Sequence, residues 1–93
     1  MIPGTTTKLS ESVVASAASV DAKSDILKVT GTTQINTIIP YVGSFSTIIW
    51  LVPVDGAITL GTSGNILIGG TAAQNKATVM VFVRTLGKWV INT

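Results

Sequence analysis

Two segments of the chain carry hydrophobic side chains at both odd and even positions. These segments are residues 47–54 and 78–85. Successive side chains of a strand point to opposite faces, so each segment has two apolar faces. In residues 47–54, Ile48, Trp50 and Val52 point to one face, and Ile49 and Leu51 point to the other. In residues 78–85, Val79, Val81 and Val83 point to one face, and Met80, Phe82 and Arg84 point to the other. We therefore expect two strands that are covered by apolar groups on both faces.

Shorter strands separated by turn signals are expected in the rest of the chain after residue 25. The candidate strands are Ile26–Val29, Gln34–Ile39, Ala57–Leu60, Ile66–Ile68 and Trp89–Ile91. Asp55-Gly56 is a dipeptide typical of tight turns, and further turn signals lie at residues 61–65, 69–70 and 86–88. Valine and isoleucine dominate the hydrophobic set, which favours an all-β fold. The architecture is left open between a sandwich, a barrel-like domain and a short β-helix-like domain.

The segment Leu9–Asp25 has a different pattern and holds four of the ten charged residues. Its hydrophobic residues fit one face of a short helix capped by Ser10, and they equally fit weak strands at Val13–Ala15 and Ala17–Val20. The first eight residues, with Pro3 and Gly4, suit an extended arm. We therefore divide the chain into an N-terminal arm or attachment segment, residues 1–25, and a β-domain, residues 26–93.

The composition favours an assembly over a monomer. The chain has 93 residues, of which 46% are hydrophobic and 11% are charged, less than half of the usual charged share of about 25%. A small domain of this kind exposes large apolar patches when it is alone, and such patches mark interfaces. The alternative is a monomeric sandwich whose two sheets cover each other, but its outer faces would need more charge. The simplest cover is another copy of the protein.

Charge and residue types argue against several other classes of function. The net charge of +2 comes from six scattered basic residues, so no basic face for nucleic acid is expected. The chain has no histidine and no cysteine, which removes the commonest general base, the commonest metal ligands and any disulfide. The charge-free stretch Val29–Val54 is interrupted by Pro40 and Pro53, so we expect buried strands and no membrane span. The start of the chain lacks the basic region of a signal peptide, and we expect a soluble protein made in the cytoplasm.

No catalytic constellation is expected. The four carboxylates are Glu11, Asp21, Asp25 and Asp55, and Asp55 suits backbone hydrogen bonding in a turn. Ser24 follows Lys23 directly, but adjacent side chains of a strand point to opposite faces, so no serine–lysine pair is expected. The glycine-rich stretches lack the Gly-Lys-Ser/Thr ending of a phosphate loop. We therefore expect no enzyme and no cofactor.

Aromatic side chains are the remaining candidates for ligand binding, since they can stack on sugars. They are Tyr41, Phe45, Trp50, Phe82 and Trp89. Trp50 lies within an apolar run, whereas Trp89 follows Gly87-Lys88 in the last strand, where partial exposure is left open. Packing in a core or an interface is the more frequent role of such residues.

The β-rich part of the chain resembles the short repeats of bacteriophage structural proteins. The resemblance rests on segments 29–38, 48–51, 55–60, 64–68, 79–83 and 87–90, whose Thr-Gly-Thr, Asp-Gly and Gly-Asn motifs recur in such proteins, and it extends from about Ile26 to Ile91. Tail fibres, head fibres and capsid decoration (cement) proteins contain these repeats, commonly as intertwined trimers. The resemblance implies a homotrimer and implies no catalytic residues.

A short arm before a small β-domain suits a capsid decoration protein better than a tail fibre, which has a long shaft. We therefore expect a virion protein on the capsid surface that binds and bridges major capsid subunits. The expected trimer interface is Ile48, Trp50, Val52, Val79, Val81 and Val83, and the expected capsid contact is Met1, Ile2, Pro3, Gly4, Thr5, Thr6, Thr7 and Lys8. The alternatives are a fibre or receptor-binding module that binds glycans, and a subunit of a non-viral β-assembly. A dimer in place of a trimer is also left open.

Overall fold

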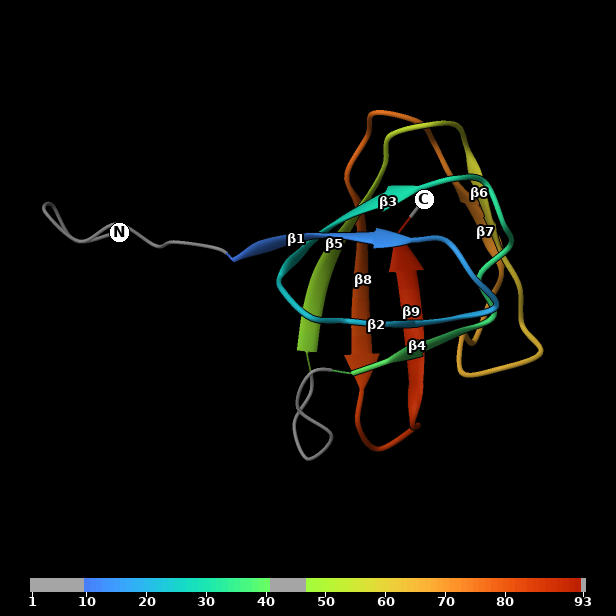
Figure 1. Cartoon of the computed structure of the whole chain (residues 1–93). Helices are drawn as coiled ribbons and strands as arrows, with labels where there is room; N and C mark the ends of the chain where they lie inside the picture. The colour runs from blue at the N-terminus through green and yellow to red at the C-terminus, as the bar shows by residue number, and fades with distance from the viewer. Residues whose placement is uncertain (1–9, 41–46, 93) are drawn as a thin grey trace, which may run out of the picture.

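The computed structural model describes residues 10–40 and 47–92, and these residues form an all-β domain (Figure 1). The strands are β1 (Glu11–Ala15), β2 (Ser19–Asp21), β3 (Ile26–Thr30), β4 (Thr37–Ile39), β5 (Thr47–Pro53), β6 (Ile58–Leu60), β7 (Gly70–Ala72), β8 (Thr78–Val83) and β9 (Lys88–Asn92). Five of them form one sheet in the order β1-β3-β5-β8-β9, and β2-β4 and β6-β7 form two-stranded sheets. The expected all-β class is confirmed.

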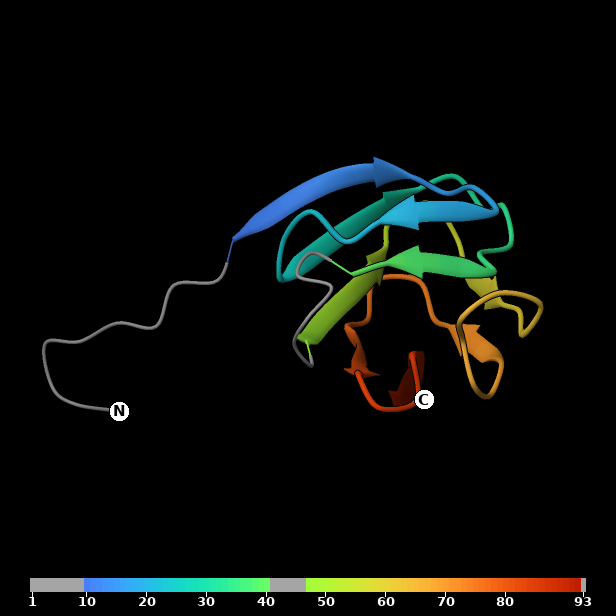
Figure 2. The ribbon, with the colours of Figure 1, turned by 90° about the horizontal axis from the view of Figure 1, so that it is seen from below.

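The first half of the described chain winds as a flattened coil. Strands β1, β3 and β5 stack in parallel in the five-stranded sheet, while β2 and β4 stack in parallel in the opposite layer (Figure 2). A parallel bridge between Ile35 and Leu60 continues the opposite layer into the third turn of the coil. This winding corresponds to the β-helix-like arrangement among the three architectures that the sequence left open.

Antiparallel strands complete the sheet beyond the coil. Strand β8 pairs antiparallel with β5 and with β9, and β6 pairs antiparallel with β7. The tight connection from β8 to β9 includes Gly87, whose φ of 64° is a left-handed conformation that glycine adopts without strain. The mixed sheet therefore has a parallel half, β1-β3-β5, and an antiparallel half, β5-β8-β9.

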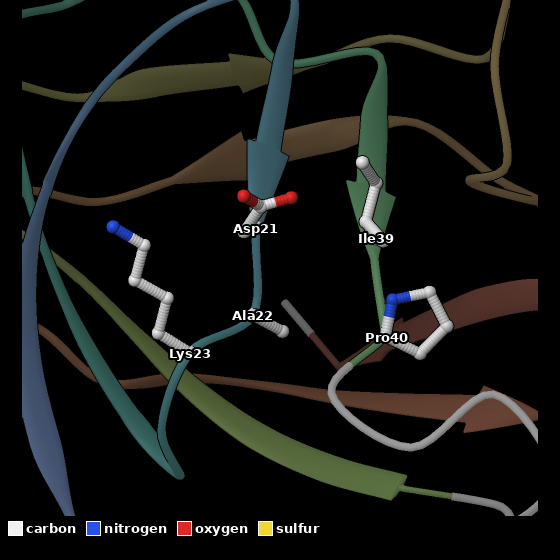
Figure 3. A pocket seen from close by; sticks show the side chains of 5 residues that line it. All are labelled: Asp21, Ala22, Lys23, Ile39 and Pro40. Carbon is white, nitrogen blue, oxygen red and sulfur yellow. The ribbon is translucent and has the colours of Figure 1, made fainter.

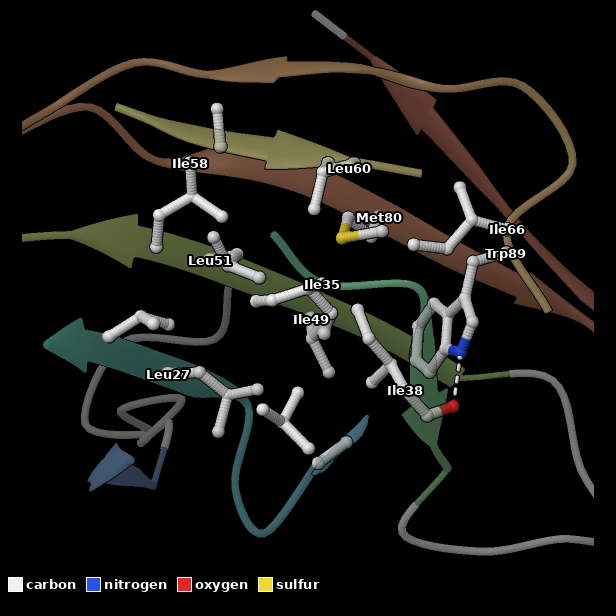
Figure 4. Packing of buried hydrophobic residues seen from close by; sticks show 14 of the residues in the cluster. Leu27, Ile35, Ile38, Ile49, Leu51, Ile58, Leu60, Ile66, Met80 and Trp89 are labelled. Carbon is white, nitrogen blue, oxygen red and sulfur yellow. Dashed lines mark hydrogen bonds between the residues drawn. The ribbon is translucent and has the colours of Figure 1, made fainter. Parts of the chain in front are cut away.

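The hydrophobic core lies between the five-stranded sheet and the opposite layer (Figure 4). Every second residue of the central strands points inward, and the side chains of Leu27, Val29, Ile49, Leu51, Met80 and Phe82 are buried. The opposite layer and its loops contribute Val20, Ile35, Ile38, Ile58, Leu60 and Ile66. The two apolar faces that the sequence predicted for β5 and β8 therefore have different roles. In each strand, alternate residues form the core, and the residues between them form the outer face of the sheet.

Strand pairing decides how three parts of the sequence fit into the structure. Residues 11–21 form strands β1 and β2, so the strand alternative for this segment holds and the helical one does not. Because β1 pairs with β3, no structural boundary separates residues 10–25 from the β-domain. The chain bends at Asp55-Gly56, as the sequence predicted, but the flanking strands do not pair with each other, since β5 pairs with β3 and β8 while β6 pairs with β7. Long-range pairing, which a local turn signal does not specify, determines these connections.

Some expectations lie outside the residues that the structure describes. The expected capsid contact, Met1–Lys8, is among them, as are Tyr41 and Phe45. Among residues 10–40 and 47–92 there is no helix long and apolar enough to cross a membrane.

Candidate functional site

The outer face of the five-stranded sheet brings together the six residues that the sequence predicted as an interface. Ile48, Trp50 and Val52 alternate with the buried residues of β5, and Val79, Val81 and Val83 alternate with those of β8. Within this set, Ile48 lies directly opposite Val81, and Trp50 lies directly opposite Val79. Directly opposite side chains of an antiparallel pair are near neighbours, so these residues form one apolar surface over two adjacent strands.

Solvent reaches this surface in the single chain. Ile48 is 48% exposed, and the other five residues are half-buried. The second layer packs on the inner face of the sheet, where the core lies. The outer face is therefore apolar, like a surface buried inside a protein, and yet solvent reaches it in the single chain. This combination marks interaction sites.

The surface continues onto the neighbouring strands through residues that the sequence analysis did not single out. Ile26 of β3 lies opposite Trp50, and Val90 of β9 lies opposite Val81. Val90 is 37% exposed, and Val13 of β1 is 61% exposed. Ile26, Val90 and Val13 alternate along their strands with Leu27, Trp89 and Val14. This period-two pattern could have identified them, once the pairing order of the strands was known. We call the six predicted residues together with Ile26 and Val90 the apolar outer face.

Charged groups on this side of the sheet lie on the strands that flank β5 and β8, with Lys28 directly opposite Val52 and Lys88 directly opposite Val83. Lys28 of β3 and Glu11 of β1 form an ion pair with 3.1 Å between Nζ and Oε1, and both side chains are largely exposed. An exposed pair of this kind contributes at most about 1 kcal/mol. Lys88 of β9 donates a hydrogen bond from Nζ to the carbonyl oxygen of Gly64. The two central strands carry no charged side chain on this face.

The candidate carboxylates make hydrogen bonds that hold the fold. Asp25 accepts hydrogen bonds through Oδ2 from the backbone N–H and the hydroxyl of Ser10, and so fixes the start of β1. Asp55 accepts a hydrogen bond of 2.7 Å from the N–H of Gly31. Among the described residues there is no group of three or more carboxylates that could hold a metal ion. These contacts give the two aspartates a structural role at the ends of strands.

Ser24 also takes part in local backbone contacts. Its hydroxyl is 2.7 Å from the carbonyl oxygen of Ile26, to which it donates, and 2.8 Å from the hydroxyl of Ser12. The residue is 8% exposed. The two serines thus tie the turn before β3 to β1.

Trp89 is buried in the core, so the expected packing role holds for it and the partial exposure that the sequence left open does not. Its exposed fraction is 0%, and its indole N–H donates a hydrogen bond of 2.8 Å to the carbonyl oxygen of Ile38 (Figure 4). Phe82 packs against it with 5.3 Å between the ring centroids. Trp89 points inward because it follows the inward parity of β9, where it lies opposite Phe82. Among the aromatic candidates that the structure describes, Trp50 alone reaches the surface to a substantial degree.

A shallow pocket lies on the opposite layer, at the ends of β2 and β4 (Figure 3). Its volume is about 250 Å³, and its lining consists of Asp21, Ala22, Lys23, Ile39 and Pro40. Binding sites for small molecules generally have about 300–1,000 Å³ and several convergent polar groups. This pocket offers one carboxylate and one amine at an open rim, so the outer face of the five-stranded sheet is the stronger candidate.

Comparisons with protein families, with curated proteins and with solved structures found no match to this chain.

Proposed function

We propose that the protein is a structural protein that associates with copies of itself through the apolar outer face. The observation that carries the proposal is the clustering of six apolar side chains on one solvent-reached face, with no charge on its two central strands. Covering apolar area stabilises an assembly by about 25 cal/mol per Å². A second copy supplies an apolar surface of the same kind.

The specific assembly that we propose is a homotrimer that decorates a bacteriophage capsid. The support for it is the resemblance of residues 26–91 to phage β-repeats, in which trimers are common. In this arrangement the outer faces of three copies meet at the threefold axis, and each trimer bridges neighbouring major capsid subunits. Three simultaneous contacts make the release of the trimer much slower than the release of any single contact. Residues 1–8 are the proposed capsid contact.

Binding to capsids tests this function. The purified trimer is expected to pellet with empty capsids, and a variant that lacks residues 1–8 is expected to remain a trimer and to stay in the supernatant. Occupancy is measured by co-sedimentation, with the native mass of each variant as the control for assembly. Equal pelleting of both variants would contradict the role of residues 1–8. A trimer that ignores capsids would contradict decoration and favour a fibre or receptor-binding role.

A further inference from the structure

Strand β1 is an edge strand whose outward backbone groups have no partner among the described residues. The N–H of Ile26 donates to the carbonyl oxygen of Ser10, and the N–H of Ser16 donates to that of Thr30, at 2.9 and 2.8 Å. These bonds set the phase of the parallel ladder, so even-numbered residues of β1 bond to β3. The N–H and C=O groups of Glu11, Val13 and Ala15 point away from β3, and no described residue pairs with them.

The other edge of the same sheet is closed at Trp89. Trp89 of β9 donates from its N–H to the carbonyl oxygen of Asn65, and it accepts a hydrogen bond from the N–H of Leu67, at 2.8 and 2.9 Å. Proteins commonly protect edge strands with such loops, with bulges or with proline. Strand β1 has no bulge and no proline, since all five of its residues pair with β3 in one continuous register, and no loop among residues 10–40 and 47–92 bonds to its outer side. Figure 2 shows β1 at the free end of the stack β1-β3-β5.

We propose that β1 pairs antiparallel with β1 of a second copy, about a twofold axis at Val13. In this register Val13 lies opposite Val13 of the second copy, and Glu11 lies opposite Ala15. All of these residues present both backbone groups to the edge, so each of the three residue pairs exchanges two hydrogen bonds. Shifting the register by two residues in either direction removes one of these pairs.

The charges at the edge favour a second copy in this orientation. Glu11 and the Asp25 carboxylate, which accepts a hydrogen bond from the N–H of Ser10, both lie at the start of β1. An antiparallel pair places these negative groups opposite the uncharged end of the partner strand. A parallel pair would set Glu11 beside Glu11, and like charges directly opposite each other are destabilising.

The exposed side chain of Val13 adds an apolar contact at the axis. It is 61% exposed, and its counterpart in the second copy would lie directly opposite on the outer side of the joined sheets. The pairing uses the backbone edge of β1, whereas the proposed trimer uses the side chains of β5 and β8. It therefore does not depend on the proposed function, and in a decorated capsid it would link one trimer to the next.

A cysteine at the axis tests the pairing directly, because the chain has no cysteine of its own. Hydrogen-bonded antiparallel pairs have Cα atoms about 5.5 Å apart, which a disulfide can span. The Val13→Cys variant is expected to form a covalent dimer under mild oxidation. The control is Ile39→Cys, at a residue 50% exposed on the opposite layer, which is expected to stay uncrosslinked. Equal crosslinking of the two variants would overturn the proposal.

The register has its own test. Glu11→Cys and Ala15→Cys are each expected to stay uncrosslinked alone, since the two equivalent positions lie roughly 14 Å apart along the paired strands. A mixture of the two variants is expected to form a disulfide, because Glu11 lies opposite Ala15. Crosslinking of either variant alone, without crosslinking of the mixture, would overturn the twofold axis at Val13.

A proline at residue 13 tests the hydrogen bonds of the edge pair separately from those that hold β1 in the fold. The N–H of Val13 points away from β3, so Val13→Pro leaves the β1–β3 hydrogen bonds in place and removes two bonds at the axis. We expect the association constant of the edge pair, measured by sedimentation, to fall at least about thirtyfold. Val13→Thr keeps the N–H and is expected to change it less than about threefold.

Unchanged association in a folded Val13→Pro variant would overturn the proposal. Crosslinking of Val13→Cys that appears only after deletion of residues 1–9 would also overturn it, because the edge would then belong to the chain's own N-terminus. Loss of capsid binding with persistent Val13→Cys crosslinking would contradict the decoration function and leave the edge pairing standing.

Discussion

The backbone carbonyl of Ile38 connects the two layers of the molecule. It accepts hydrogen bonds from the indole N–H of Trp89 and from the side-chain amide of Asn65, and the same amide accepts from the N–H of Ile38. Asn65 therefore acts as a substitute for a neighbouring strand along the edge of β4. Ile38 is fully buried, so each of its polar groups depends on these partners.

Substitution of Asn65 is expected to destabilise the fold. Asn65→Ala leaves the buried N–H of Ile38 without a partner, which costs about 1–3 kcal/mol. Asn65→Asp keeps the acceptor but sets a carboxylate oxygen against the Ile38 carbonyl, so at pH 7 we expect a loss at least as large. The additional loss of stability in Asn65→Asp, relative to Asn65→Ala, should shrink below about pH 4, where a carboxyl group takes up its proton.

Urea unfolding at both pH values measures these differences. Asn36→Ala is the control, since the Asn36 side chain accepts an exposed hydrogen bond from Gln34, and it is expected to cost less than about 0.5 kcal/mol. Equal stability of Asn65→Ala and the wild type would contradict the role of Asn65.

The end of each parallel strand of the coil depends on the turn that follows it. After β3, Gly31 has a φ of 73°, and its N–H donates to Asp55 at the end of β5. A Cβ at Gly31 would lie 2.8 Å from the hydroxyl oxygen of Ser16, which accepts a hydrogen bond from the N–H of Thr33. The second turn of the coil thus contacts the turn after it through Gly31 and the turn before it through Thr33.

Two glycines with similar backbone angles separate backbone strain from packing. Gly87→Ala is expected to cost about 1–2 kcal/mol from its left-handed conformation alone, because a Cβ there meets nothing within 4 Å. Gly31→Ala adds the clash with Ser16 and should cost at least about 1 kcal/mol more. Thermal or urea unfolding of the two variants gives the difference. Equal losses would show that Ser16 moves away freely.

The sequence predicted the faces of the long strands because side-chain parity is a local property. The alternation within residues 47–54 and 78–83 separated the buried Ile49 and Leu51 from the outer Ile48 and Trp50. Segment 9–25 remained ambiguous because its few apolar residues fit both a period of 3.6 and a period of two. Pairing order could not be predicted, since β1 and β3 meet through contacts about 15 residues apart that no local signal encodes.

The same limit applied to the candidate site. The six outer residues were identified from parity, but their gathering on one surface required the antiparallel pairing of β5 with β8. The exposure of Trp89 was left open because the burial of an aromatic residue in a terminal strand depends on the partner strand, here β8 with Phe82. The free edge of β1 is a property of backbone direction, which residue types do not reveal.

At the scale of the whole molecule, the core is well packed, whereas part of the surface is apolar or has unpaired backbone groups among the described residues. The core between the layers contains hydrophobic side chains from both, and the described buried side-chain polar atoms all have hydrogen-bond partners. The apolar outer face and the edge of β1 are the two surfaces of the described residues that we propose for contacts with other molecules. Together they support an account in which the 93-residue chain functions as one unit of a larger assembly.

The native mass of two matched variants tests that account most directly. Lysine in Ile48→Lys places a charge at the centre of the apolar outer face, and Ile39→Lys makes the same change at a residue of similar exposure on the opposite layer, 48% against 50%. Sedimentation equilibrium should give the wild type and Ile39→Lys three times the chain mass of 9.6 kDa, or a multiple of that where β1 edges pair. Ile48→Lys should lose the threefold assembly and retain at most the β1-paired dimer. A wild type that is monomeric at micromolar concentration, or an Ile48→Lys variant that remains trimeric, would contradict it.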